Sequence, residues 1–238
     1  MSYDLTPFEE GLKKLNISLS QEQIHQFLTY YEMLIEKNKV MNLTAITEYD
    51  QVIEKHFLDS LSLCRVKNLD EKLSVLDLGT GAGFPGIPLK IAFPKLQITL
   101  ADSLNKRVLF LQEVIDGLGL KDITAIHGRA EELASKKEMR QSYDLVVSRA
   151  VANLSTLSEY CLPFVHEGGQ FISYKSGDYE EELAASKKAI SILGGQLATI
   201  DEFELGESKR SFIVIDKVKA TPKAYPRKAG TPSKNPLS

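Results

Sequence analysis

The fold is decided by the stretch SVLDLGTGAGFPG, residues Ser74–Gly86. An apolar run with one acidic residue, typical of a buried strand, leads there into a glycine-rich turn. Glycines in a turn between a strand and a helix permit positive φ angles and let the backbone approach a ligand closely. Pro85 and Pro88 suit the first helical turn, because a missing N–H costs little there. The stretch therefore predicts a strand, a ligand-binding turn and a helix.

Two nucleotide-binding interpretations of this turn compete. Gly81, Gly83 and Gly86 spell the G-x-G-x-x-G pattern of NAD-binding proteins. The strand ends at Leu78, however, so that pattern begins too late in the chain. A turn formed by Gly79, Gly81 and Gly83, with Asp77 one step inside the strand, fits better. A carboxylate this close to the turn would repel a pyrophosphate but suits the ammonium group of a methionine moiety. The pattern favours S-adenosylmethionine (AdoMet), with contacts from Asp77, Gly79, Thr80, Gly81, Gly83 and Phe84.

Two later segments complete the predicted cofactor site. Asp102 ends the next strand, where a carboxylate can accept hydrogen bonds from both hydroxyls of a ribose. A plainer interpretation of Asp102 is an acidic residue at a helix N-terminus, beside Ser103. The third contact is expected after the third strand, where the backbone around Ala130 and Glu131 would meet the adenine edge.

Outward from the turn, short β-rich runs alternate with helical patterns. Such alternation predicts a largely parallel sheet covered by helices on both faces. The last two strands are separated only by a polar turn, residues 204–209, and should form an antiparallel hairpin at the edge. The expected class is a Rossmann-like, seven-stranded α/β methyltransferase sheet within residues 66–218. Its strands are predicted at Ser74–Leu78, Gln97–Ala101, Asp122–Ile126, Tyr143–Ser148, Gly169–Tyr174, Gln196–Ile200 and Ser211–Ile215.

Residues 1–65 predict an N-terminal helical extension. An apolar stripe at helical spacing begins at Ile24, and Ser20 with Gln23 forms a capping box before it. Thr47 with Asp50 is expected to cap the next helix in the same way. The stripe consists of Ile24, Phe27, Leu28, Tyr31, Leu34 and Ile35.

Composition limits the function classes. No stretch is apolar enough to span a bilayer and no signal peptide is recognisable, which favours the cytoplasm. Cys64 and Cys161 lack partners at ligand spacing, so we expect no metal site and no disulfide. The net charge is −3, yet the residues from Lys217 onward carry six basic and no acidic side chains, leaving −9 for residues 1–216. This basic, proline-rich tail, residues 219–238, is predicted to be extended; it can target an anionic partner, although charge alone favours a solvated terminus.

The acceptor side of the site is expected after the fourth strand, where Arg149 follows Ser148. No Asn/Asp-Pro-Pro-aromatic run is present to hold an exocyclic amine, and Cys161 lacks the setting of an attacking thiolate. An acceptor that is already nucleophilic is therefore favoured, such as N7 of guanine, which has a free lone pair and needs no general base. Alignment and exclusion of water would then suffice for catalysis. For both Arg149 and Arg129 a salt bridge to a surface acid is an equally good interpretation.

A resemblance makes these expectations specific. The segments Asn42–Thr44, His56–Ser60, Asp77–Gly86, Ser148–Ala150 and Tyr225–Arg227 occur in this order. The chain resembles, over essentially its full length, the RsmG family of bacterial 16S rRNA guanine-N7 methyltransferases, also called glucose-inhibited division protein B. The resemblance implies one guanine of the decoding-region loop of 16S rRNA as substrate, in RNA or in the small ribosomal subunit, and a monomeric enzyme.

The resemblance also implies roles for particular residues. Arg129, Arg149 and Lys175 match the active-site region of the family, and Arg149 lies beside the cofactor as well. The tail residues Arg227, Lys228 and Lys234 become candidates for RNA contacts, most simply to phosphates. His56 and Asp59 are expected to fasten the N-terminal helices to the glycine-turn side of the sheet. Phe84 is expected to pack beneath the turn rather than stack on a base.

Other functions remain open on the sequence. One is a methyltransferase acting on another RNA base, a protein or a small molecule. A second, of a different class, is a non-catalytic module that binds AdoMet or RNA. Methyl incorporation with a turnover count separates the second from the enzymes, and the nature of the acceptor separates the enzymes from one another.

Overall fold

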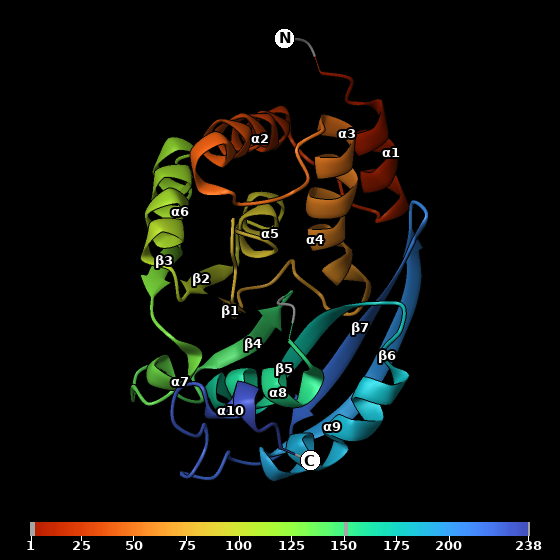
Figure 1. Cartoon of the computed structure of the whole chain (residues 1–238). Helices are drawn as coiled ribbons and strands as arrows, with labels where there is room; N and C mark the ends of the chain where they lie inside the picture. Colours follow the sequence, from red (N-terminus) through yellow and green to blue (C-terminus); the bar gives the residue numbers. More distant parts are fainter. Residues whose placement is uncertain (1–2, 150–151, 238) are drawn as a thin grey trace.

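The computed structural model describes residues 3–149 and 152–237. Its centre is a seven-stranded sheet with the order β3-β2-β1-β4-β5-β7-β6, in which only β7 runs antiparallel to its neighbours (Figure 1). The predicted sheet with its antiparallel edge hairpin is thus confirmed. The strands are β1 (Ser74–Leu78), β2 (Gln97–Asp102), β3 (Ile123–His127), β4 (Tyr143–Ser148), β5 (Val165–Ser176), β6 (Gly195–Leu205) and β7 (Ser208–Lys217).

Helices cover both faces of this sheet (Figure 1). One face carries α1 (Thr6–Lys14), α2 (Gln21–Met41), α3 (Tyr49–Val52), the π-helix η1 (Ile53–Leu58), α4 (Asp59–Leu61), the 3₁₀-helix η2 (Ser62–Arg65), α5 (Gly86–Ala92) and α6 (Asn105–Gly117). The other face carries α7 (Ala130–Leu133), α8 (Leu154–Cys161), the 3₁₀-helix η3 (Leu162–Phe164), α9 (Glu180–Ile192) and α10 (Thr231–Lys234). None of the helices in the described residues is long and apolar enough to cross a membrane.

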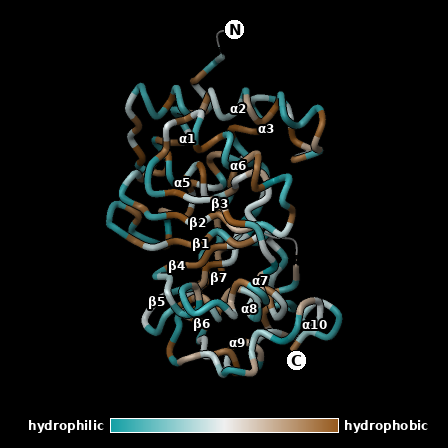
Figure 2. Tube along the Cα trace, turned by 90° about the vertical axis from the view of Figure 1, so that its left-hand side faces the viewer, coloured by the Kyte–Doolittle hydropathy of each residue, from teal (hydrophilic) through white to brown (hydrophobic). Residues whose placement is uncertain are grey.

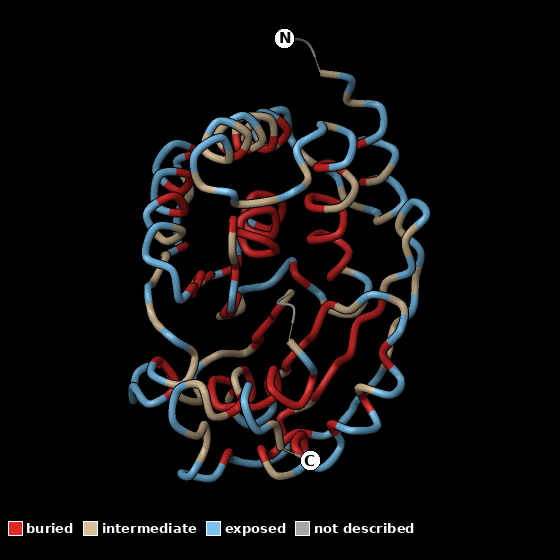
Figure 3. Tube along the Cα trace, in the orientation of Figure 1, coloured by how far each residue is buried: buried red, intermediate tan, exposed pale blue. Residues whose placement is uncertain are grey.

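The core lies in two layers, one on each face of the sheet. Apolar strand residues are fully buried in the middle of the molecule, as the continuous buried stretches in Figure 3 and the hydrophobic stretches of the central strands in Figure 2 illustrate. Phe27, Tyr30 and Phe57 of the N-terminal helices share one layer with Val75 and Leu100 of the sheet. The N-terminal helices therefore complete the same core as the sheet. The predicted domain boundaries at residues 65 and 218 stay predictions.

The N-terminal helices agree with the sequence pattern in most respects. The capping box of Ser20 and Gln23 opens α2, and the helix ends before Asn42, which adopts a left-handed conformation. Of the predicted stripe, Ile24, Phe27 and Leu34 are buried, whereas Leu28, Tyr31 and Ile35 are only half-buried. Tyr30, which was not part of the prediction, is buried instead. The expected second capping box is wrong: α3 begins at Tyr49 after Glu48, without a side-chain cap.

The tail differs from its prediction. It is not extended throughout, because α10 forms over Thr231–Lys234 with Pro232 in its first turn, where proline is tolerated. It is also packed against the domain rather than solvated: Thr156 donates a hydrogen bond to the carbonyl of Pro232, 3.1 Å away. Lys217 does not belong to an accessible tail either, since it ends β7 and is 1% exposed.

Candidate active site

A cavity of about 620 Å³ opens at the carboxyl ends of β1, β2 and β4. Open parallel α/β sheets bind ligands in this position. The wall combines the glycine turn with segments far from it in sequence. These are Leu43 and Thr44 from the segment after α2, His56 from η1, and Gly230 and Ser233 from the tail. Nine of the predicted site residues line it: Gly79, Thr80, Gly81, Phe84, Asp102, Arg129, Ala130, Glu131 and Arg149.

The glycine turn follows β1 as predicted. Gly79, Gly81 and Gly83 have φ angles of 75°, 62° and 110°, a region that other residues enter only with strain. Gly83 is the residue of the turn that faces the N-terminal helices: an added Cβ there would come 2.8 Å from the Tyr30 hydroxyl. That hydroxyl donates a buried hydrogen bond of 2.6 Å to the carbonyl of Ala82. The extension therefore holds the turn in place from below, a contact that the sequence analysis did not predict.

Asp77 lies beneath the turn rather than in the cavity wall. Its Oδ2 accepts hydrogen bonds from the Thr80 hydroxyl at 2.6 Å and from the Gly86 amide at 2.8 Å. Its Oδ1 is buried and has no hydrogen-bond partner among the described residues. Burial raises the pKa of this carboxyl to about 7, although both hydrogen bonds act in the opposite direction.

Asp102 closes the other side of the turn. Its Oδ2 accepts a hydrogen bond from the Gly81 amide at 3.0 Å and lies 3.4 Å from Nη1 of Arg107, while its Oδ1 accepts from the Leu104 amide at 2.9 Å. The carboxylate is 4% exposed and faces the cavity. It therefore fixes the segment between β2 and α6 without capping that helix, and it is positioned to accept hydrogen bonds from a ligand.

This donor set fits AdoMet. The unpartnered oxygen of Asp77 and the carboxylate of Asp102 suit an ammonium group and ribose hydroxyls, respectively. The turn offers backbone unobstructed by Cβ atoms; a Cβ on Gly81 would meet nothing within 4 Å, so the positive φ alone requires glycine there. Ala130 and Glu131 lie at the opposite rim, where the adenine contact was predicted.

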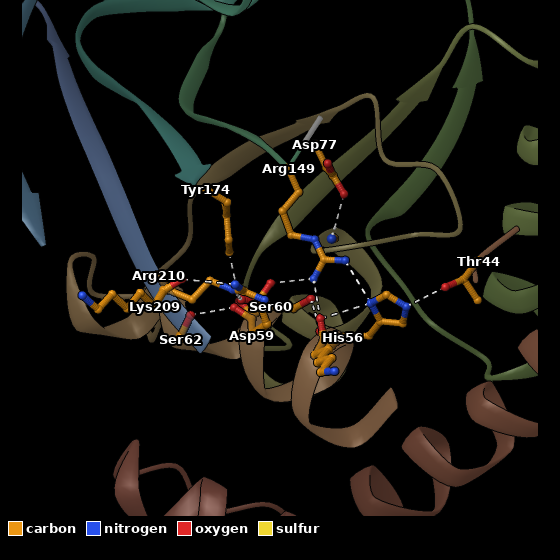
Figure 4. Close-up of polar contacts among 12 residues, drawn as sticks. Thr44, His56, Asp59, Ser60, Ser62, Asp77, Arg149, Tyr174, Lys209 and Arg210 are labelled. Carbon is orange, nitrogen blue, oxygen red and sulfur yellow. Dashed lines mark hydrogen bonds and ion pairs between the residues drawn. The ribbon is translucent and has the colours of Figure 1, made fainter. Parts of the chain in front are cut away.

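Arg149 follows β4 in the cavity wall and is fixed there by the N-terminal helices (Figure 4). Its Nη1 donates to Oδ2 of Asp59 at 2.7 Å, and its Nη2 lies 3.1 Å from Nδ1 of His56. The second oxygen of Asp59 accepts from Nε of Arg210 on β7 at 2.9 Å. Asp59 is therefore paired with two arginines, which offsets its burial. The salt-bridge interpretation of Arg149 is correct, but its acid is buried rather than on the surface.

His56 lies between Arg149 and the glycine turn. Its ring stacks on Phe84 with centroids 4.4 Å apart and 19° between the planes, and its Nε2 lies 2.8 Å from the Thr44 hydroxyl. Burial, reinforced by the positive charge of Arg149, lowers the pKa of His56 to about 4. The ring is therefore neutral near pH 7. Nδ1 also lies 3.1 Å from the carbonyl of Lys55, so both ring nitrogens are engaged by the protein. His56 and Asp59 fasten the helices to the sheet as expected.

Phe84 has the packing role that the sequence analysis favoured. It is 5% exposed and contacts the rings of Tyr30, Phe57 and His56, and the Arg149 guanidinium carbon lies 5.3 Å from its ring centroid. It lines the cavity from beneath the turn.

The other two basic candidates lie apart from Arg149. Arg129 is an exposed residue on the cavity wall, and its guanidinium makes no hydrogen bond or ion pair with a described residue. Lys175 lies outside this cavity, where it donates to Glu182 at 2.7 Å and to the carbonyl of Ala152 at 2.9 Å. It lines instead a smaller cavity on the other side of Arg149.

The tail is held against α8 by a buried ion pair. Arg227 donates from Nη2 to Oε2 of Glu159 at 2.6 Å, and Glu159 is fully buried. The Gly230 amide donates to Oε1 of Glu131 at 2.8 Å, which brings Gly230 and Ser233 to the cavity wall. The guanidinium of Arg227 is thus committed to the fold, whereas Lys228 and Lys234 are exposed.

Several residues of the site were missed at the sequence level. They are Thr44, Tyr30, Arg107, Tyr160 and the tail residues Gly230 and Ser233. The resemblance included the segment Asn42–Thr44 but gave Thr44 no role in the site. No group of three or more His, Cys, Asp and Glu side chains suited to a metal ion occurs within the ranges 3–149 and 152–237.

Comparison with known proteins agrees with this geometry. A family model described as GidB, rRNA small subunit methyltransferase G, matches residues 23–213. The ribosomal RNA small subunit methyltransferase G of Lachnoclostridium phytofermentans is 54% identical, with 98% of both chains covered. The Bacillus subtilis protein of the same description is 48% identical, covering 98% of this chain and 99% of that protein. Among solved structures, M. jannaschii TYW2 in complex with AdoMet has a TM-score of 0.56 at 15% identity, over 73% of this chain and 80% of that chain, a likeness of fold.

Proposed function

The chain belongs to the GidB family of rRNA small subunit methyltransferase G, and on this premise we propose that it methylates N7 of one guanine in the decoding-region loop of 16S rRNA. The methyl donor is AdoMet, which when bound supplies an electrophilic methyl group on its sulfonium. Asp102, the glycine turn and the rim at Ala130 and Glu131 would hold it. Asp77, buried beneath the turn, would attract its ammonium group by charge.

The observation that carries the N7 assignment is that the titratable side chains around the cavity already have hydrogen-bond partners within the protein. Both ring nitrogens of His56 have hydrogen-bond partners, and the carboxylates of Asp102 and Glu131 accept backbone amides. Among the described residues that line the cavity, His56 and Asp102 therefore have all their titratable atoms engaged. The oxygen of Glu131 that has no partner in the described part of the chain belongs to the rim that we assign to the adenine, so this set offers no free general base for the acceptor. N7 of guanine carries a lone pair and no proton, so this absence costs nothing in the reaction.

The residues of the chain would then act by positioning. Arg149 is anchored by Asp59 and His56, so its guanidinium is oriented before the substrate arrives. A guanidinium bonded to N7 itself would block the lone pair, so we assign Arg149 and the unpaired Arg129 to the O6 oxygen or a phosphate. Lys228 and Lys234 are exposed and are assigned to RNA phosphates, whereas Arg227 supports them through Glu159. The proposal includes a monomer that acts in the cytoplasm, where ribosomes are assembled, without a metal.

The test uses small ribosomal subunits from a strain that lacks this protein, incubated with the purified protein and AdoMet labelled in its methyl group. We expect label in the RNA fraction, with many methyl groups transferred per chain. The variant Asp102→Ala should lose both AdoMet binding and transfer. Label in ribosomal protein would contradict the RNA acceptor. Tight AdoMet binding with less than one methyl transferred per chain would indicate a non-catalytic module.

A further inference from the structure

A second, smaller cavity lies on the opposite side of Arg149 and His56 from the AdoMet cavity. Its volume is about 310 Å³, and the side chains of Arg149 and His56 belong to the walls of both cavities. The small cavity lies where η1 meets the ends of β5 and β7, next to the network in Figure 4. Lys55, Asp59, Lys175 and Arg210 complete the charged part of its wall.

The charge of this wall is strongly positive. Lys55, Arg149, Lys175 and Arg210 face the cavity, whereas Asp59 is the only carboxylate among the described residues that line it. Glu182 neutralises Lys175 from outside the wall. With His56 neutral, four cations stand against two carboxylates, which leaves an excess of two positive charges.

Part of the donor capacity is unused. No hydrogen bond or ion pair joins the half-buried Lys55 ammonium to a described residue. Arg210 donates from Nε to Asp59 and from Nη1 to the carbonyl of Lys209, which leaves Nη2 without a partner in the described part of the chain. An ammonium and a guanidinium edge in one cavity are a common combination for recognising a phosphate. Ile46 and Tyr174 supply the apolar part of this wall, and the charged side chains make up most of the rest.

We propose that this small cavity binds a phosphate of the RNA backbone adjacent to the nucleotide whose base enters the AdoMet cavity. The inference rests on the proposed function. Arg149 and His56 separate the two cavities, so a nucleotide in one and its neighbouring phosphate in the other lie on either side of one shared wall. Asp59 fixes Arg149 and Arg210 together, and it thereby couples the geometry of the phosphate site to that of the acceptor site.

Lys55 is the residue that tests this inference, because it has no partner in the fold to lose. The variant Lys55→Met is compared with Lys121→Met, which removes an exposed lysine before β3, at the opposite edge of the sheet. Binding to a hairpin RNA of the decoding-region sequence is measured by fluorescence anisotropy between 50 and 250 mM salt, a range in which phosphate contacts dominate the salt dependence. AdoMet affinity is measured in parallel by calorimetry.

Loss of one phosphate contact should weaken RNA binding by Lys55→Met about tenfold at low salt and reduce the slope of log K against log salt by about 1. Lys55→Arg should restore most of the affinity, and Lys121→Met should behave as the wild type. AdoMet affinity and thermal stability should stay unchanged in all three variants.

Equal salt slopes for Lys55→Met and Lys121→Met would overturn the phosphate site, even if the wild type methylates RNA. A loss of AdoMet binding or of stability in Lys55→Met would also overturn it, because Lys55 would then have a structural role. The proposed function fails separately: RNA binding with the predicted change of slope, but without methyl transfer by the wild type, would retain the phosphate site and contradict the enzyme.

Discussion

Arg149 is the residue at which the two parts of the site meet. It follows β4 on the sheet, and its partners Asp59 and His56 come from the N-terminal helices about 90 positions earlier. Its location on the acceptor side could be predicted, since residues after a parallel strand lie at the carboxyl edge of the sheet. Its partners could not be, because no periodicity specifies which buried acid of one segment meets which base of another. The neutral state of His56 follows from this pairing and from burial.

The depressed pKa of His56 makes stability depend on pH. The unfolded chain binds a proton at this residue below about pH 6.5, whereas the folded protein resists it until about pH 4. Stability is therefore complete above pH 6.5 and is lost as the pH falls toward 4, by about 2 kcal/mol at pH 5. Urea unfolding of the wild type and of His56→Gln at pH 7 and pH 5 measures this difference. An equal loss in both proteins would contradict a buried neutral His56.

The raised pKa of Asp77 predicts that cofactor binding also weakens as the pH falls. Below pH 7 the carboxyl is protonated in the free protein, so binding of a cationic ammonium must first remove a proton. AdoMet affinity should fall by up to about tenfold for each pH unit between 7 and 5.5. In Asp77→Asn the affinity should be lower at pH 7.5 and independent of pH over this range. Calorimetry of both proteins across the range is the measurement, and parallel curves would assign the pH dependence to another group.

At the scale of elements, the glycine turn, the π-helix η1 and the tail form the site. The turn could be predicted in detail, because positive φ angles restrict the residue type at Gly79, Gly81 and Gly83. The tail could not, because its proline content and charge are those of a solvated segment. The tail packs on the domain through the ion pair between Arg227 and Glu159, a fully buried acid on α8. No local sequence pattern indicates that Glu159 is buried.

The tail is expected to detach when this ion pair is broken. Arg227→Ala leaves the carboxylate of Glu159 buried without its partner, which should cost about 3–5 kcal/mol of stability. AdoMet binding should weaken as well, because Gly230 and Ser233 leave the cavity wall. The neighbouring exposed lysine provides the control, since Lys228→Ala should leave both quantities unchanged. Denaturant unfolding and calorimetry test this, and unchanged AdoMet affinity in Arg227→Ala would show that the tail is not part of the cofactor site.

At the scale of the whole molecule, the number of strands and the antiparallel hairpin at the edge of the sheet could be predicted from the sequence. The predicted boundaries of β1 and β4 match the structure, because both strands are apolar and end at clear turn residues. The hairpin of β6 and β7 is longer than predicted, since most residues of β6 are exposed and give no hydrophobic alternation. The sequence pattern predicts the N-terminal helices as an extension of the sheet domain, and Tyr30 and Phe57 of these helices are buried in the core beneath the turn. Their structural role follows from contacts that only the fold creates.

The central claim is that one guanine N7 in rRNA accepts the methyl group in this cavity. The most direct measurement treats rRNA from small subunits methylated by the purified protein with borohydride and aniline, which cleave the chain at N7-methylguanosine, and maps the cut. We predict a single cut in the decoding-region loop that depends on the protein and disappears with Asp102→Ala. Methyl incorporation into the RNA without such a cut would retain the methyltransferase and contradict N7 as the acceptor.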